Sequence, residues 1–151
     1  MLGADDQSLN ERTRTGDFDN ETRFESPISV YVNVIDVGSS PKQENEGVLG
    51  VGLYRSEFFL NRFQWFPSEE EQFQEYYSLC KRWPNSVVTI RTFDIGGDKQ
   101  FPFLSLGPQE NPFLGLRAHR LYAFHPSFFI TQVKAILRAG LACGELRLLL
   151  P

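Results

Sequence analysis

The chain has 151 residues, a formal net charge of −4 and 41% hydrophobic residues, including 14 phenylalanines, which is the composition of one ordinary globular domain. The negative charge leaves no basic footprint for nucleic acid, and no apolar run approaches the roughly 20 residues that a membrane-spanning helix needs. We therefore expect neither nucleic acid nor a membrane as a partner.

The N-terminal segment and the cysteines indicate the compartment. Residues 1–27 are polar and poor in apolar side chains, so we expect a disordered tail or linker. This segment has no apolar core of the kind that a secretory signal needs, which favours a cytoplasmic protein. Cys80 and Cys143 form neither a CxxC motif nor a metal-ligand spacing, and we expect two free thiols.

Strands and helices are predicted to alternate from residue 28 onward. The β-branched run 28–35 and the apolar run 48–54 predict two buried strands. Between them, Ser40 and Pro41 are typical of the start of a short helix, which Gly47 would close.

The clearest helix is predicted over residues 68–82. Ser68 and Glu71 form the S-x-x-E pattern of a capping box, and acidic residues fill the first turn, where the helix dipole favours them. Four residues recur at helical spacing and predict one face that packs into the core. They are Phe73, Tyr76, Tyr77 and Cys80.

The second half of the chain continues the alternation. The runs 87–93 and 146–151 predict a third and a fourth strand, and Asn111 and Pro112 can start a helical segment between them. A further helix is predicted with Ser127 as its N-cap. Its expected apolar face contains Phe129, Val133, Ile136, Leu137 and Gly140, with Lys134 and Arg138 off that face.

This alternation, with strands apolar on both faces, predicts an α/β fold in which helices cover a parallel sheet. Two architectures fit the pattern: an open doubly wound sheet and a piece of a barrel. Four strand–helix units in about 125 residues match half of a (β/α)₈ barrel of ~250 residues. We therefore expect a partial TIM barrel made of about its first four β/α units.

Two arginines lie at the ends of neighbouring predicted strands. Arg55 directly follows the run 48–54, and Arg91 lies near the end of the next strand. Ligands of parallel sheets bind at the carboxyl ends of strands, and a guanidinium group matches phosphate or carboxylate. The pattern therefore favours an anion site. Structural ion pairs remain an alternative, Arg55 with Glu57 and Arg91 with Asp94.

Other charged residues give weaker indications. Arg117 and Arg120 could reach the same end of the sheet, and Lys99 could either cover a phosphate or remain a solvated surface lysine. His119 and His125 have no cysteine or acidic ligand nearby in the sequence, so we expect no metal site in this chain.

Five segments carry a resemblance to a known family. In this order they are GLYRSEFF, PSEEEQF, IRTFDIGGDK, ENPFLGLRAHR and QVKAILRAG. They resemble the phosphoenolpyruvate-binding barrel domain of the phosphoenolpyruvate–protein phosphotransferases, the Enzyme I family of the sugar phosphotransferase system. The resemblance runs from about residue 28 to residue 151. The pyruvate phosphate dikinases and phosphoenolpyruvate synthases share the barrel but resemble the chain less across IRTFDIGGDK.

The resemblance implies that residues 28–151 are the N-terminal half of a barrel that binds phosphoenolpyruvate with magnesium. It implies that Arg55 and Arg91 are substrate ligands and that Arg117 matches a third arginine, which supports the phosphate. We expect Asp94 and Asp98 to orient these cations rather than to bind metal. The family passes the phosphoryl group to an enzyme histidine on a separate domain and on to a phosphocarrier protein for sugar uptake.

The chain departs from the family in several ways. The phosphohistidine, the magnesium carboxylates and the proton-donating cysteine of the family have no counterpart here, and His119 replaces an apolar residue. We therefore expect no catalytic residue in this chain, magnesium held by residues that it lacks, and a carrier contact through a missing domain. Two interpretations stay open: a piece that works only with its remainder, and a non-catalytic remnant or interaction module.

A half-barrel also predicts self-association. Its first and fourth strands would be open, mostly apolar edges, and unpaired edges invite pairing with another chain. We expect aggregation or edge-to-edge dimerisation of the isolated chain.

Overall fold

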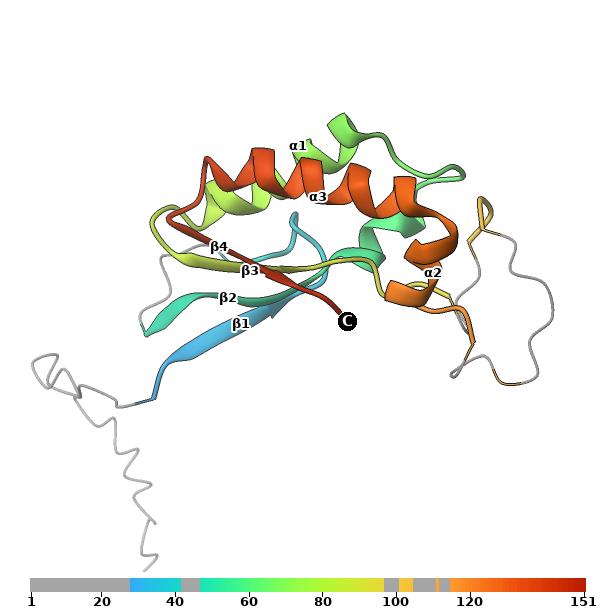
Figure 1. Ribbon diagram of the computed structural model, residues 1–151. Helices are drawn as coiled ribbons and strands as arrows, with labels where there is room; N and C mark the ends of the chain where they lie inside the picture. The colour runs from blue at the N-terminus through green and yellow to red at the C-terminus, as the bar shows by residue number, and fades with distance from the viewer. Residues whose placement is uncertain (1–27, 42–46, 97–100, 105–110, 112–114) are drawn as a thin grey trace, which may run out of the picture.

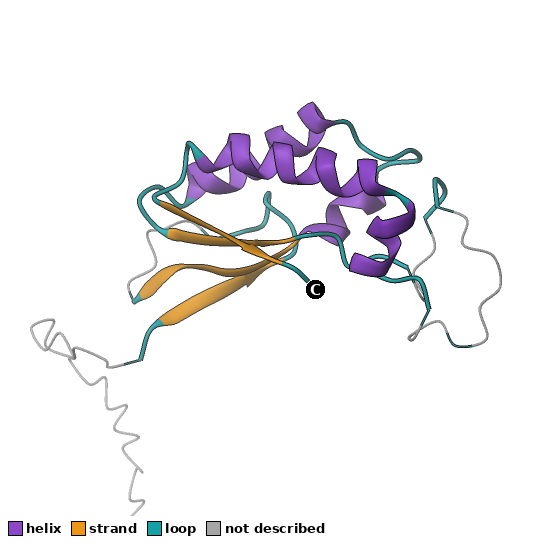
Figure 2. Ribbon diagram, in the orientation of Figure 1, coloured by secondary structure: helices purple, strands orange, loops and turns teal. Residues whose placement is uncertain are grey.

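The computed structural model describes residues 28–41, 47–96, 101–104, 111 and 115–151 (Figures 1 and 2). No helix in this part of the chain is long and apolar enough to cross a membrane. The expected tail over residues 1–27 and most of the short helix predicted after Pro41 lie outside the described residues. The elements in order are β1 (Val30–Val34), β2 (Val48–Arg55), the 3₁₀ helix η1 (Ser56–Arg62), α1 (Glu69–Arg82), β3 (Val87–Arg91), α2 (His119–Phe124), α3 (Pro126–Gly140) and β4 (Glu145–Leu149).

The four strands form one parallel sheet with the order β1-β2-β3-β4. The predicted strands are confirmed, with ends that differ by a few residues. The spatial order follows the sequence order without the reversal that defines a doubly wound sheet, so the described strands argue against that alternative.

Helices α1 and α3 lie side by side on one face of the sheet, and no helix of the described residues covers the opposite face, which we call the uncovered face (Figure 1). The capping box of α1 is confirmed, because Ser68 Oγ accepts from the Glu71 N–H at 3.2 Å while Glu71 Oε2 accepts from the Ser68 N–H at 2.7 Å. The predicted core face of this helix is also confirmed: Tyr76 and Cys80 are buried, and Phe73 and Tyr77 pack partly buried against the same core.

The helical predictions after β3 have different outcomes. Asn111 lies in a bend and helix α2 begins at His119, while Pro112 and the two residues after it lie outside the described residues, so the helical segment predicted to start there is not tested. Helix α3 has Pro126 at its first position and His125, not Ser127, as its N-cap, because the fixed φ of proline suits the first helical turn.

The buried face of α3 is also rotated from the predicted one. Leu137 is 63% exposed, whereas Gln132, Ala135, Ile136 and Ala139 are buried. Gln132 is accommodated because its side chain forms hydrogen bonds to Tyr76, Ser56 and the backbone N–H of Phe93. A pattern based on apolar residues alone could not reveal a buried glutamine.

Cys80 and Cys143 form a disulfide, so the expectation of two free thiols is wrong. Their Cα atoms are 5.0 Å apart although 63 positions separate them in the sequence. Helix α1 leads into β3 and helix α3 leads into β4. Since these strands are parallel, both helices end near the amino ends of the strands. The turn after α3 packs closely on the turn after α1, since a Cβ at Gly144 would come within 2.6 Å of the Asn85 backbone.

Reduction of this disulfide is expected to lower the free energy of unfolding by about 2–4 kcal/mol, because the bond restricts the unfolded chain. Urea unfolding followed by the fluorescence of Trp83, which is fully buried, measures the change with and without dithiothreitol. The Cys80→Ala/Cys143→Ser double variant is the control and should not respond to the reductant. Equal midpoints for the reduced and oxidised wild-type chain would contradict the prediction.

Candidate functional site

Arg55 and Arg91 lie side by side at the carboxyl ends of β2 and β3, where they are register partners. Side chains alternate along a strand, and Ile90 packs into the core beneath the helices, so Arg91 lies on the uncovered face of the sheet. The side chain of Arg91 is 16% exposed and that of Arg55 is 39% exposed. The fold therefore brings both predicted arginines together at the carboxyl ends of the two inner strands.

Glu57 joins these two arginines. It lies in η1, directly after β2, and its side chain is only 3% exposed. Its Oε1 accepts a hydrogen bond from Arg55 Nε at 3.3 Å and another from Arg91 Nη2. Both ion pairs that the sequence left open are present, Arg55 with Glu57 and Arg91 with Asp94. The contact between Glu57 and Arg91 was missed because 34 positions separate these residues.

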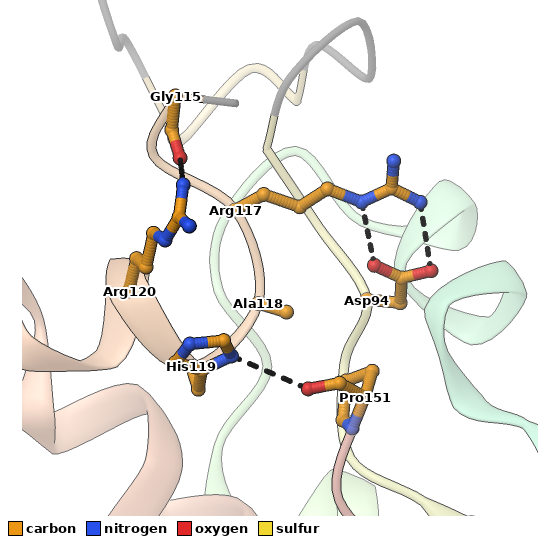
Figure 3. Close-up of a pocket in the computed structure, with 7 residues that line it drawn as sticks. All are labelled: Asp94, Gly115, Arg117, Ala118, His119, Arg120 and Pro151. Carbon is orange, nitrogen blue, oxygen red and sulfur yellow. Dashed lines mark hydrogen bonds and ion pairs between the residues drawn. The ribbon is translucent and has the colours of Figure 1, made fainter. Parts of the chain in front are cut away.

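Asp94 joins Arg91 to Arg117. Arg117 donates from Nε to Asp94 Oδ1 at 2.9 Å and from Nη2 to Oδ2 at 3.0 Å (Figure 3). Arg91 Nη2 lies 3.5 Å from the same Oδ2. A bidentate pair of this kind fixes the plane of the guanidinium group. Asp94 therefore orients two arginines, as expected, while Asp98 lies outside the described residues.

Gly96 allows the segment that contains Arg117 to pack close to Asp94. It forms an antiparallel bridge with Arg117, and the Ala118 N–H donates to the Ile95 carbonyl at 2.9 Å. The φ of Gly96 is +102°, and a Cβ there would meet the Leu116 carbonyl oxygen at 2.1 Å. Only glycine allows this close approach of the two segments.

Buried polar side chains hold the segment after β3 in place. Phe93 donates its N–H to Gln132 Oε1 at 2.9 Å and accepts from the hydroxyl of Tyr122 at 2.6 Å. Burial raises the pKa of Tyr122 to about 12, so its hydroxyl stays protonated and donates at neutral pH. Neither side chain was predicted to support the site, because a polar residue in a helix ordinarily indicates the solvent face.

Three arginines and two carboxylates thus alternate in one continuous chain of ion pairs. We call this set the arginine cluster: Arg55, Glu57, Arg91, Asp94 and Arg117. Its guanidinium groups exceed its carboxylates by one, so the cluster as a whole is positive. Guanidinium groups that are already fixed in place can bind an anion without first losing side-chain freedom.

A pocket of about 320 Å³ adjoins the arginine cluster and shares Asp94 and Arg117 with it (Figure 3). His119 and Arg120 line the pocket, with His119 Nδ1 3.3 Å from the Pro151 carbonyl oxygen and Arg120 Nη1 3.5 Å from that of Gly115. The other lining residues are Gly115, Ala118 and Pro151. Lys99 lies outside the described residues.

The described residues do not provide a magnesium site. No three histidine, cysteine, aspartate or glutamate side chains come together among them. The carboxylates of Glu57 and Asp94 already accept hydrogen bonds from guanidinium groups, which would compete with a cation. We therefore derive no step through magnesium from these residues.

Comparisons with known proteins agree with the expected resemblance. A family model described as "PEP-utilising enzyme, PEP-binding domain" matches residues 10–151. The phosphoenolpyruvate-protein phosphotransferase of Priestia megaterium is 46% identical over 108 residues, which are 72% of this chain and 18% of that protein. The protein of the same name from Buchnera aphidicola subsp. Baizongia pistaciae is 38% identical over 131 residues, which are 86% of this chain and 22% of that protein.

An Escherichia coli K12 protein named "phosphoenolpyruvate-dependent phosphotransferase system" is 37% identical over an alignment 153 positions long with its gaps, which covers 99% of this chain and 19% of that protein. The chain therefore spans about a fifth of the length of the curated relatives that it matches. The family match covers most of the chain, and the matched residues 10–151 include every member of the arginine cluster. The chain belongs to the PEP-utilising enzyme family and corresponds to its PEP-binding domain.

Proposed function

We propose that this chain is the phosphoenolpyruvate-binding part of a phosphotransferase, and that Arg55, Arg91 and Arg117 hold the substrate phosphate. The observation that carries the proposal is the arginine cluster itself, in which buried or nearly buried carboxylates fix three guanidinium groups at the carboxyl ends of the strands. Phosphoryl transfer depends largely on positioning the phosphate and neutralising its charge, which such groups can do.

Arg91 is the central ligand in this proposal. It lies between Glu57 and Asp94 and is the least exposed of the three arginines. Its environment is less hydrated than a surface site, so its attraction for a phosphate is weakened less by water and salt. Arg55 contacts Glu57 through Nε and reaches solvent. It would bind the phosphate from one side of Arg91, and Arg117 would bind it from the other.

The proposal includes a partial TIM barrel over residues 28–151. It is supported by the parallel order β1-β2-β3-β4, by two helices on the same face of the sheet, and by the position of the arginines at the carboxyl ends of the strands. The uncovered face of the sheet would then be the inside of the barrel.

In the complete reaction, the phosphoryl group would pass to an enzyme histidine and on to a phosphocarrier protein for sugar uptake in the cytoplasm. The names of the curated relatives support the transfer of a phosphoryl group from phosphoenolpyruvate, whereas the histidine, the carrier, sugar uptake and the cytoplasm rest on the family resemblance of the sequence. The phosphohistidine, the magnesium ligands and the carrier-binding domain are assigned to residues outside this chain, so the chain alone would be inactive. The disulfide is the observation that fits a reducing cytoplasm least well.

A non-catalytic interaction module with the same fold is the second candidate. It is favoured by the ion pairs themselves, because Glu57 and Asp94 already neutralise much of the positive charge of the arginines. The two candidates differ in one measurable property, which is the binding of phosphoenolpyruvate by the folded chain.

Arg91→Lys is expected to weaken phosphoenolpyruvate binding about 10- to 100-fold in calorimetric titrations, because lysine keeps the charge that balances Glu57 but loses the planar fork. Arg55→Gln should weaken binding less, since its side chain is more exposed. Arg138→Gln is the matched control, because this arginine pairs with Glu69 and Glu70 of α1, away from the arginine cluster. Equal affinity in the wild-type and Arg91→Lys chains would refute the proposed role.

Self-association is expected to follow from the outer edges of β1 and β4, which have no neighbouring strand in the described sheet. Exposed apolar residues lie along both strands, including Val30 and Leu148. Sedimentation velocity of the isolated chain should show dimers or larger species, and Leu148→Lys should reduce them. Leu137→Lys, on the exposed face of α3, is the control for non-specific effects of added charge. A monomer at all concentrations would contradict edge pairing.

A further inference from the structure

Gln132 is a buried polar side chain between the two segments that carry the carboxylates of the arginine cluster. It belongs to α3 and is fully buried. Its Oε1 accepts a hydrogen bond from the N–H of Phe93 at 2.9 Å, and its Nε2 donates to Ser56 Oγ at 3.1 Å. Phe93 directly precedes Asp94, and Ser56 directly precedes Glu57. A single amide group therefore contacts the neighbours of both carboxylates.

The amide of Gln132 is used at both of its ends, which defines its orientation. Nε2 has two hydrogens, and its second partner is the hydroxyl of Tyr76 of α1, at 2.9 Å. Burial raises the pKa of Tyr76 above its usual range, so this hydroxyl stays protonated at neutral pH. The Ser56 hydroxyl donates its only hydrogen to the Arg91 carbonyl at 2.6 Å, so it accepts from the amide. The network therefore requires an amide at this position, since a carboxylate would lack both hydrogens.

The pairing of β2 with β3 ends at the arginine cluster. The last register pair of these strands is Arg55 with Arg91. Beyond this pair the chain continues from β2 into η1 and from β3 into the segment that contains Asp94. Ser56 and Gln132 connect these two segments. The spacing of the two carboxylates, and of the guanidinium groups that they hold, therefore depends on this connection.

We propose that Gln132 is a positioning residue, which sets the geometry of the arginine cluster and through it the affinity for phosphoenolpyruvate. The inference rests on the proposed function, which assigns substrate binding to that cluster. Gln132 acts through Ser56 and Phe93. A displacement of about 1 Å in groups that hold a substrate can lower a reaction rate about 100-fold, so a side chain that only fixes such groups can be as important as a ligand.

Calorimetric titration with phosphoenolpyruvate compares two buried glutamines. Gln132→Met keeps most of the side-chain volume but removes the amide, and it is expected to weaken binding about 10-fold. Gln72→Met is the matched control, because Gln72 is a fully buried glutamine of α1 whose Nε2 donates to the Pro67 carbonyl at 2.8 Å. Its affinity should stay within about 2-fold of that of the wild-type chain. Urea unfolding of each variant separates lost stability from lost affinity.

Ser56→Ala keeps the test decisive if Gln132→Met does not fold. This variant leaves the glutamine in place and removes only the hydroxyl through which it reaches η1 and the Arg91 carbonyl. The expected loss of phosphoenolpyruvate affinity is about 3-fold, because one connection is removed rather than all of them.

The Nε–H group of Arg91 provides a readout that needs no ligand. Its Nε atom is buried, so its hydrogen should exchange slowly with water and give a separate nuclear magnetic resonance signal, which Arg91→Lys assigns. Gln132→Met is expected to shift this signal and to make the exchange at least about 3-fold faster, whereas Gln72→Met should do neither. A purely structural glutamine would lower the free energy of unfolding and leave the signal unchanged, and that outcome overturns the inference.

The outcomes separate this inference from the proposed function. If Arg91→Lys weakens phosphoenolpyruvate binding while Gln132→Met, or Ser56→Ala in its place, leaves affinity unchanged, the positioning role is overturned and the proposed function stands. If phosphoenolpyruvate does not bind, or binds equally to the Arg91→Lys chain, while the Arg91 signal responds to Gln132→Met, the proposed phosphate site fails and the positioning of the cluster stands. If neither binding nor the signal responds, both are overturned.

Discussion

The arrangement of the site depends on two carboxylates placed between three arginines. Two unit charges of the same sign 4 Å apart repel by about 4 kcal/mol at the effective dielectric constant of a protein surface, so neighbouring guanidinium groups would not remain together unaided. Glu57 offsets this repulsion between Arg55 and Arg91, and Asp94 does the same between Arg91 and Arg117. These two carboxylates therefore hold the three guanidinium groups together.

The position of each carboxylate depends in turn on buried polar contacts. Ser56, next to Glu57, donates its hydroxyl to the Arg91 carbonyl at 2.6 Å and accepts from the Gln132 amide at 3.1 Å. Gln132 also accepts from Phe93 at the other side of the site, next to Asp94. A single buried glutamine of α3 thus links η1 to the segment after β3. Such a network is stabilising because each of its groups has a partner, whereas an unpaired buried polar group costs free energy.

The ion pairs and the proposed anion site are compatible for a physical reason. A guanidinium group has five N–H donors in a plane, so a carboxylate on one edge does not use the whole group. The carboxylates also lower the net charge of the site, which limits how strongly it attracts anions in general. The result expected from this balance is a site with defined geometry and moderate affinity, suited to a substrate that must bind and leave. The neighbouring pocket lies on the Arg117 side of this site, where the shared residues connect the two.

The sequence by itself determined the strands, the capped helix α1 and the family, because these depend on local periodicity, capping residues and short motifs. It also placed Arg55 and Arg91 at the ends of adjacent strands, since residues that end neighbouring parallel strands meet at one edge. Tertiary structure alone decided the contact between Glu57 and Arg91, the disulfide between Cys80 and Cys143, and the buried face of α3. Each of these depends on which distant segments the folded chain brings together, and residue spacing along the sequence contains no information about such contacts.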